Sequence, residues 1–210
     1  MNMTTWKELN WFKFEGSIFI EEFKGTFTII FTRMESEFRQ SRDRRDQDIS
    51  NKPDNEYLGE ELSWSKERLQ KESQILTAMI LTVTFRAIQD LLNELLYWST
   101  GQRSGIEKLN RLEDKYQKVG VILSDQKEFD IIKELRLARN SCVHNSNKPD
   151  KEYQEYYPKP RWLDSNGNIN VSKAQWDELI AQLELWTNEL VQRMTENQKR
   201  VYEAKRKTTT

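Results

Sequence analysis

Apolar residues recur at spacings of three and four along most of this chain, and this helical period constrains the fold more than any other feature. In the first part of the chain the period runs through Ile20, Phe23, Phe27, Ile30, Met34 and Phe38. It predicts a helix over roughly 17–42. In the last part the period runs through Trp176, Leu179, Leu183, Trp186, Leu190 and Met194. It predicts a final helix that begins after Ser172.

Three further helices are predicted between these two. The segment 63–99 has the same period, and its middle, 75–85, is apolar on nearly every side, so we expect that part to be buried among several neighbours. Ser104 with Glu107 forms a capping box for a short helix over 106–118. Asp125 with Glu128 forms another for a helix over about 125–145.

The segments between the helices complete the expected fold. The polar stretch 42–61 is predicted to be a mobile loop, the tail 205–210 to be frayed, and the flanks of the turn at 164–167 to pair as a small hairpin. With only 7 Gly and 4 Pro in 210 residues, few tight turns are available, which argues against a sandwich or barrel. We therefore predict one all-α domain over 1–210, an up-and-down bundle of four long helices and a short one.

Charge and composition exclude several classes of function. Lysine and arginine (33) nearly balance aspartate and glutamate (34), so the net charge of -1 gives no general attraction for nucleic acid. One cysteine, Cys142, and one histidine, His144, exclude an internal disulfide and a Cys/His zinc site. The N-terminus lacks the pattern of a signal peptide, and the longest uncharged apolar stretch, 73–85, is too short for a bilayer. We expect a cytoplasmic protein that binds no membrane and no cofactor.

The helix predicted over 125–145 has two contrasting faces. Because a helix turns by about 100° per residue, Ile131, Leu135, Ala138 and Cys142 fall within about 40° of one direction and form an apolar stripe. Arg136, Asn140 and His144 follow each other at intervals of four and form a polar stripe on the opposite side. Arg139 falls at the border between the two stripes, and its long side chain can reach the polar one.

The residues of this polar face suit the chemistry of a phosphate ester. The guanidinium of arginine matches two phosphate oxygens at once, and histidine can accept and return a proton near neutral pH. Asparagine can orient either partner. From Arg136 to His144 the polar face contains no acidic residue, whereas the outer face of the last helix includes Glu178, Glu184 and Glu189.

The sequence RNSCVH, from Arg139 to His144, resembles the R-x4-6-H motif of the HEPN superfamily, including the polar residue directly after the arginine. In that family the motif lies near the end of a helix in a four- or five-helix bundle. The resemblance implies a metal-independent endoribonuclease that acts as a dimer, of the kind found in toxin–antitoxin, anti-phage and RNA-processing systems. Ser146 stands where the branch paired with nucleotidyltransferase antitoxins has a tyrosine, which leaves the branch unassigned.

If the resemblance holds, each residue of the motif has an expected role. His144 would be the general base or acid, Arg139 the phosphate clamp, Asn140 an orienting residue and Arg136 an auxiliary RNA contact. One histidine supplies only half of an acid–base pair. We therefore expect a homodimer whose two polar stripes form one composite active site on RNA, with a cognate antitoxin or regulatory protein as a further partner.

Each of these residues also has a purely structural interpretation. His144 could bind backbone carbonyls at a helix end, and Arg136 and Arg139 could form ion pairs with Glu134 or Asp130. Cys142 lies on the apolar stripe and is expected to be a buried small hydrophobe. The aromatic residues after the motif could stack on bases, although packing over the end of the bundle is the expectation: Tyr153, Tyr156, Tyr157 and Trp162. The rival function is a non-catalytic helical module that binds a partner protein or nucleotide.

Overall fold

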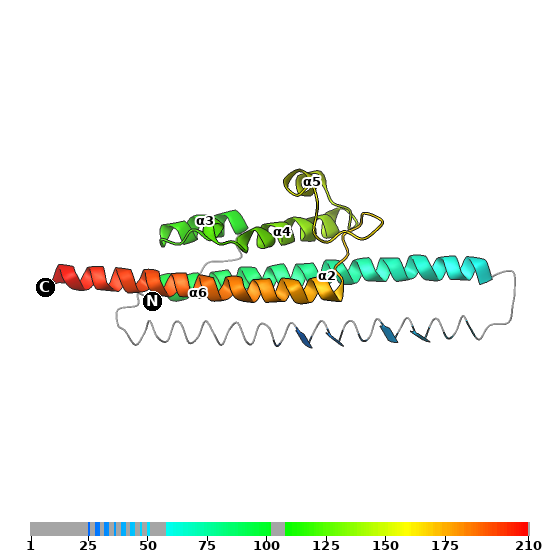
Figure 1. The fold of residues 1–210 in the computed structure, drawn as a ribbon, viewed down its shortest axis with the longest axis horizontal. Coiled ribbons are helices and arrows are strands. Elements are labelled where there is room, and N and C mark those ends of the chain that lie inside the picture. The colour runs from blue at the N-terminus through cyan, green and yellow to red at the C-terminus, as the bar shows by residue number, and fades with distance from the viewer. Residues whose placement is uncertain are drawn as a thin grey trace. The chain divides into compact units, whose positions relative to one another are not determined.

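The computed structural model describes residues 58–101 and 108–209, together with separate positions between residues 25 and 50. Its helices are α2 (Leu58–Thr100), α3 (Leu109–Lys118), the 3-10 turn η1 (Leu123–Asp125), α4 (Phe129–His144), α5 (Lys151–Tyr156) and α6 (Lys173–Thr209) (Figure 1). The described residues contain no strand, and their one β-bridge joins Leu163 to Ile169. The all-α prediction is confirmed for this part of the chain, and so is the small pairing around the turn at 164–167.

The described chain divides into two compact units. One contains the described residues of Thr84–Arg136 and Lys173–Thr210, and the other contains the described residues of Gly25–Val83 together with Leu137–Ser172. Helices α2 and α4 each continue without a break from one unit into the other. The single domain over 1–210 and the up-and-down order of its helices stay predictions.

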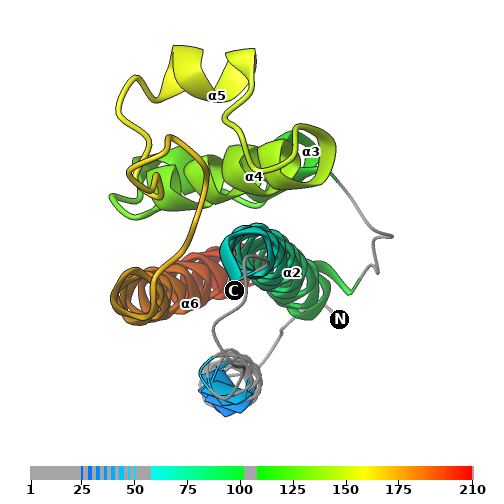
Figure 2. The same cartoon turned by 90° about the vertical axis from the view of Figure 1, so that its right-hand side faces the viewer.

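The first unit has two layers. The second half of α2 runs beside α6, and α3 with the first half of α4 lies over this pair (Figures 1 and 2). The rings of Phe129 and Trp186 stack with centroids 6.2 Å apart, and the hydroxyl of buried Tyr116 donates a hydrogen bond of 2.8 Å to the carbonyl oxygen of Leu92. The entire predicted stripe of the last helix is buried here: Trp176, Leu179, Leu183, Trp186, Leu190 and Met194.

The second unit joins the first half of α2 to the end of α4 and to the segment that contains α5. Asn170 accepts hydrogen bonds at Oδ1 from Thr77 (3.2 Å) and Ser73 (3.4 Å), both on α2. Tyr153 and Trp162 are fully buried. Helix α5 is absent from the sequence-based prediction. Its N-terminal signal is nevertheless present in the sequence: the Asp150 carboxylate caps the helix by accepting a hydrogen bond of 2.8 Å from the Tyr153 amide.

Helix α2 corrects the expectation for 75–85. Ile75, Met79 and Val83 are exposed by 60%, 51% and 43%, so this segment is not buried on every side. Their spacing of four places them on one stripe of the helix, while Leu81 and Thr84 lie on its buried side. By length and composition the segment Gln70–Thr100 could cross a membrane, but the partly buried core helix of a soluble protein passes the same test. Cytoplasmic localisation stays a prediction.

Two expected flexible segments are helical where the structure describes them. Asp43, Arg44, Gln47 and Ser50 are helical, and α2 begins at Leu58, so the loop expected over 42–61 is wrong at these positions. Helix α6 continues to Thr209, so the expected tail is helical where the structure describes it, and its fraying stays a prediction. In the segment 42–61, mixed charge and a turn signal at Pro53-Asp54-Asn55 favour a loop, but several of its charged residues also have high helix propensity.

Helices α3 and α4 do not begin where the predicted capping boxes place their first residues. Helix α3 begins at Leu109, preceded by Lys108, which makes no side-chain cap, and Ser104 lies outside the described residues. Asp125 belongs to η1, and α4 begins four residues later at Phe129. In the helix expected over 17–42, the described positions are helical and exposed, and its apolar stripe lies outside the described residues.

Candidate functional site

The buried face of α4 follows the predicted apolar stripe. Ile131, Leu135, Ala138 and Cys142 are all buried, as the spacing predicted. The buried face is wider than that stripe, because it includes further positions on either side: Ile132, Glu134, Leu137 and Ser141. The four candidate residues, Arg136, Arg139, Asn140 and His144, lie outside it: the first three are half-buried and His144 is exposed.

Arg139 and Asn140 are brought together directly. Nη1 of Arg139 donates a hydrogen bond of 2.9 Å to Oδ1 of Asn140. Because Asn140 belongs to the polar stripe, this bond draws the guanidinium from the border of the helix toward that stripe. Arginine has five N–H donors, and this bond uses one of them. Within the residues that the structure describes, no other partner of Arg139 is present, so its other donors can bind a ligand oxygen.

His144 is the last residue of α4. Its side chain is exposed, and within the part of the chain that the structure describes it forms no hydrogen bond to Arg139 or Asn140. A helix-terminal histidine with a purely structural role would also lie here, so position alone does not separate the two interpretations.

Arg136 lies two helical turns before His144 on the same stripe. Eight residues correspond to a rise of about 12 Å along the helix axis. Arg136 already interacts with another group of the protein. The helix geometry therefore allows Arg136 only an auxiliary role, at a distance from His144.

Cys142 does not belong to the reactive face. Burial raises the pKa of its thiol to about 12, so the thiol stays protonated at neutral pH. A protonated and buried thiol is a poor nucleophile. This agrees with its interpretation as a small hydrophobe of the apolar stripe.

The aromatic residues after the motif separate into two groups. Tyr153 and Trp162 are fully buried and pack inside the second unit, as expected. Tyr157 is half-buried, and its ring meets that of Tyr153 edge-on with centroids 5.9 Å apart. Tyr156 is 70% exposed and is the most accessible of these four aromatic residues.

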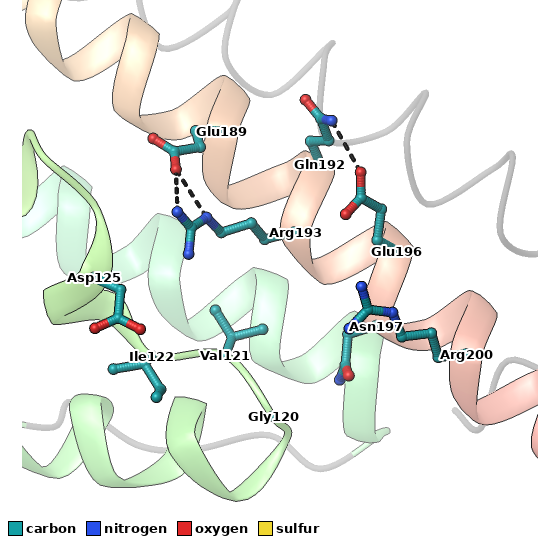
Figure 3. Close-up of a pocket in the computed structure, with 10 residues that line it drawn as sticks. All are labelled: Gly120, Val121, Ile122, Asp125, Glu189, Gln192, Arg193, Glu196, Asn197 and Arg200. Atoms are coloured by element: carbon teal, nitrogen blue, oxygen red, sulfur yellow. Dashed lines mark hydrogen bonds and ion pairs between the residues drawn. The ribbon is translucent and has the colours of Figure 1, made fainter.

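A separate cleft of about 460 Å³ lies in the first unit, between α6 and the loop that follows α3 (Figure 3). Its lining includes three carboxylates, Asp125, Glu189 and Glu196, and two guanidinium groups, Arg193 and Arg200. Nε of Arg193 donates a hydrogen bond of 2.8 Å to Glu189, which neutralises that pair. The remaining charge is negative on balance, so this cleft is not suited to the phosphates of RNA.

Comparisons with known proteins add no family. No family model matches the chain, and no curated protein or solved structure matches it. The described residues contain no group of three or more His, Cys, Asp and Glu side chains that could hold a metal ion. Metal independence stays a prediction, and the resemblance to HEPN proteins rests on the motif and its helix.

Proposed function

We propose that this protein is a metal-independent endoribonuclease of the HEPN type, and that it acts as a toxin or an anti-phage effector in the cytoplasm. One observation carries the proposal: outside its buried face, α4 presents a hydrogen-bonded Arg139–Asn140 pair with His144 at its end. The residues combine a phosphate clamp, a group that orients it and an imidazole that can take and return a proton.

The proposed reaction uses the nucleophile that RNA itself carries. His144 acts as base or acid: as base it takes the proton of the 2′-hydroxyl, whose oxygen attacks the neighbouring phosphorus. The bond from phosphorus to the 5′-oxygen breaks, and that oxygen leaves with a proton from the general acid. Arg139 stabilises the negative charge on the phosphate oxygens during the displacement. The products are a 2′,3′-cyclic phosphate and a free 5′-hydroxyl.

Acid and base roles are usually divided between two groups, and each chain contains one histidine. The proposal therefore includes a homodimer in which two α4 helices contribute to one cleft. Such a dimer would gather the arginines of two chains around the RNA backbone. That local charge replaces the general attraction which a net charge of -1 does not provide.

The test is to incubate matched RNA and DNA strands with the protein in excess EDTA and to identify the ends of the products. RNA cut to a 2′,3′-cyclic phosphate and a 5′-hydroxyl, with DNA left intact, supports the proposal. Activity that EDTA removes and Mg²⁺ restores contradicts the metal independence of the proposal. Efficient cutting of DNA contradicts the mechanism, because DNA lacks the 2′-hydroxyl that acts as the nucleophile.

The second candidate is a helical module that binds a partner protein without catalysis. The exposed apolar stripe of Ile75, Met79 and Val83 on α2 favours it, because surfaces of this kind often serve in binding. The two candidates differ in what they require of His144. A binding module keeps its affinity for the partner in a His144→Ala variant, whereas the ribonuclease loses cleavage.

A further inference from the structure

The chain leaves α4 through two residues with positive φ. Ser146 has φ of 51° and Asn147 has φ of 63°. Before them, the amide of Asn145 still donates to the carbonyl oxygen of Ser141 at 2.8 Å, so the helical pattern ends just there. The left-handed conformation is strained for most residues, and asparagine tolerates it better than other residues with a side chain.

Asn147 is also buried, with 4% of its surface exposed. Its side-chain Nδ2 donates one hydrogen bond to the carbonyl oxygen of Gln74 on α2 and one to that of Ile169, each of 3.1 Å. Its own carbonyl oxygen accepts a hydrogen bond of 2.6 Å from the Ile169 amide. One side chain therefore joins the end of α4 to two segments that are distant in sequence.

Asparagine suits this position better than its nearest substitutes. A carboxamide nitrogen has two protons, which match the two carbonyl oxygens that face it. An aspartate would direct a carboxylate at the same two oxygens. A glycine would keep the backbone conformation but leave both oxygens without this donor, and an alanine would also be strained by the positive φ.

The last turn of α4 is held from its other side as well. Oγ of buried Ser141 accepts a hydrogen bond of 3.1 Å from the amide of Asp150, at the start of α5. His144 lies three residues after Ser141 and three before Asn147. The backbone that carries its imidazole is thus fixed at both ends by bonds to other segments.

We propose that Asn147 is a positioning residue for His144. It acts by fixing the end of α4 against α2 and the segment at Ile169, so that the imidazole is presented in one direction. A catalytic group must be held within a fraction of an ångström of its productive place, and small displacements lower the rate steeply. The catalytic part of this inference rests on the proposed ribonuclease activity.

His144 is the only histidine, so its imidazole gives one resolved set of signals in the NMR spectrum of histidine-labelled full-length protein. Asn147→Gly keeps the positive φ and removes the two side-chain bonds. We expect it to shift or broaden the imidazole signals and to lower kcat by about 10- to 100-fold with little change in KM. The matched control is Asn145→Ala, which removes an exposed side chain that donates to the nearby Lys148 carbonyl, and it should leave both readouts unchanged.

Two further variants separate positioning from stability. Leu190→Ala removes a buried side chain of the first unit and should lower stability without moving the imidazole signals. Thr77→Val is nearly isosteric, removes one bond to Asn170 in the same junction, and should change the signals and kcat in the same direction as Asn147→Gly but less. If Asn147→Gly does not fold, Thr77→Val provides the test.

The outcomes are distinct for the two proposals. A wild-type protein that cuts no RNA in EDTA refutes the ribonuclease, whereas the imidazole spectrum still tests the positioning. A folded Asn147→Gly variant with the wild-type spectrum and wild-type kcat overturns the role of Asn147. The same holds if Leu190→Ala, at equal loss of stability, moves the imidazole signals as far as Asn147→Gly does.

Discussion

At the scale of residues, Arg139 and His144 are five positions apart on one helix, which separates them by about 140° around its axis. Side chains in such positions do not meet by helix geometry alone. The hydrogen bond from Arg139 to Asn140 reduces this separation, because it draws the guanidinium toward the stripe that contains His144. Asn140 therefore supports Arg139, and the proposed role of His144 requires its freely accessible position at the end of α4.

The first prediction concerns these two side chains. Arg139→Ala and His144→Ala should each abolish RNA cleavage and shift the free energy of unfolding by about 0.5 kcal/mol or less, because neither deletion opens a cavity. Arg139→Lys is the matched control for charge: it keeps the cation but loses the fork that binds two phosphate oxygens, so its rate should fall well below wild type. Rates come from single-turnover cleavage and stability from urea unfolding. Wild-type cleavage by His144→Ala would show that the catalytic assignment is wrong.

The second prediction concerns Cys142. Its buried thiol should react with a thiol reagent such as DTNB much more slowly in the native protein than in urea. Since burial raises its pKa to about 12, the stability that the neutral thiol contributes is fully present below the unfolded pKa of about 8.5 and is lost as the pH rises toward 12. As the pH rises above about 8.5, the free energy of unfolding should therefore fall less in Cys142→Ala than in the wild type. Native and unfolded protein reacting at equal rates would refute the burial of this thiol.

At the scale of elements, the long helices could be predicted because each must bury one stripe, and burial leaves a period in the sequence. The expected ranges 63–99 and 106–118 correspond to α2 and α3 within a few residues. Helix α5 has six residues, which is too short to show a helical period in the sequence. The capping residue Asp150 is its one local sequence signal. The exposed stripe of α2, formed by Ile75, Met79 and Val83, could not be predicted from the sequence. Where apolar residues lie on every side of a helix, the pattern does not show which side packs against a neighbour.

The candidate site was predictable to a similar extent. Arg139, Asn140 and His144 could be found because their spacing along one helix is local information. Asn147 could not, because its partners, Gln74 and Ile169, are far from it in the sequence and no pattern connects them. The only local signal is an asparagine directly after a helix end, where a left-handed residue is common.

The third prediction concerns the loop between α3 and η1. Gly120 has φ of 82°, and a Cβ at this position would lie 2.9 Å from Oδ1 of Asn197. Asn197 is held in place because it donates to the carbonyl oxygen of Val119. Gly167 has a similar φ of 73° but open space around it. Gly167→Ala should therefore cost about 1–2 kcal/mol, the strain of the conformation alone, and Gly120→Ala clearly more. Equal losses in urea unfolding would contradict the close approach to Asn197.

At the scale of the whole molecule, the balance of charge and the single histidine lead to the same expectation. A chain with a net charge of -1 has no general attraction for RNA, and one imidazole cannot serve as acid and base at the same moment. Association of two chains through the polar stripe of α4 addresses both points at once. It brings two histidines together and concentrates the arginines of both chains.

The last prediction is therefore a homodimer with a shared active site. Sedimentation of the wild type at micromolar concentration should give twice the mass of the 25.2 kDa chain. Mixing the wild type with an excess of His144→Ala should lower the activity per wild-type chain, because exchange of subunits leaves most wild-type chains beside a partner without an imidazole. The matched control is an excess of Gly167→Ala, which alters a residue outside the polar stripe and should leave that activity unchanged. A monomeric protein with full activity would refute the composite site, because the second proton transfer would then need a group other than a second His144.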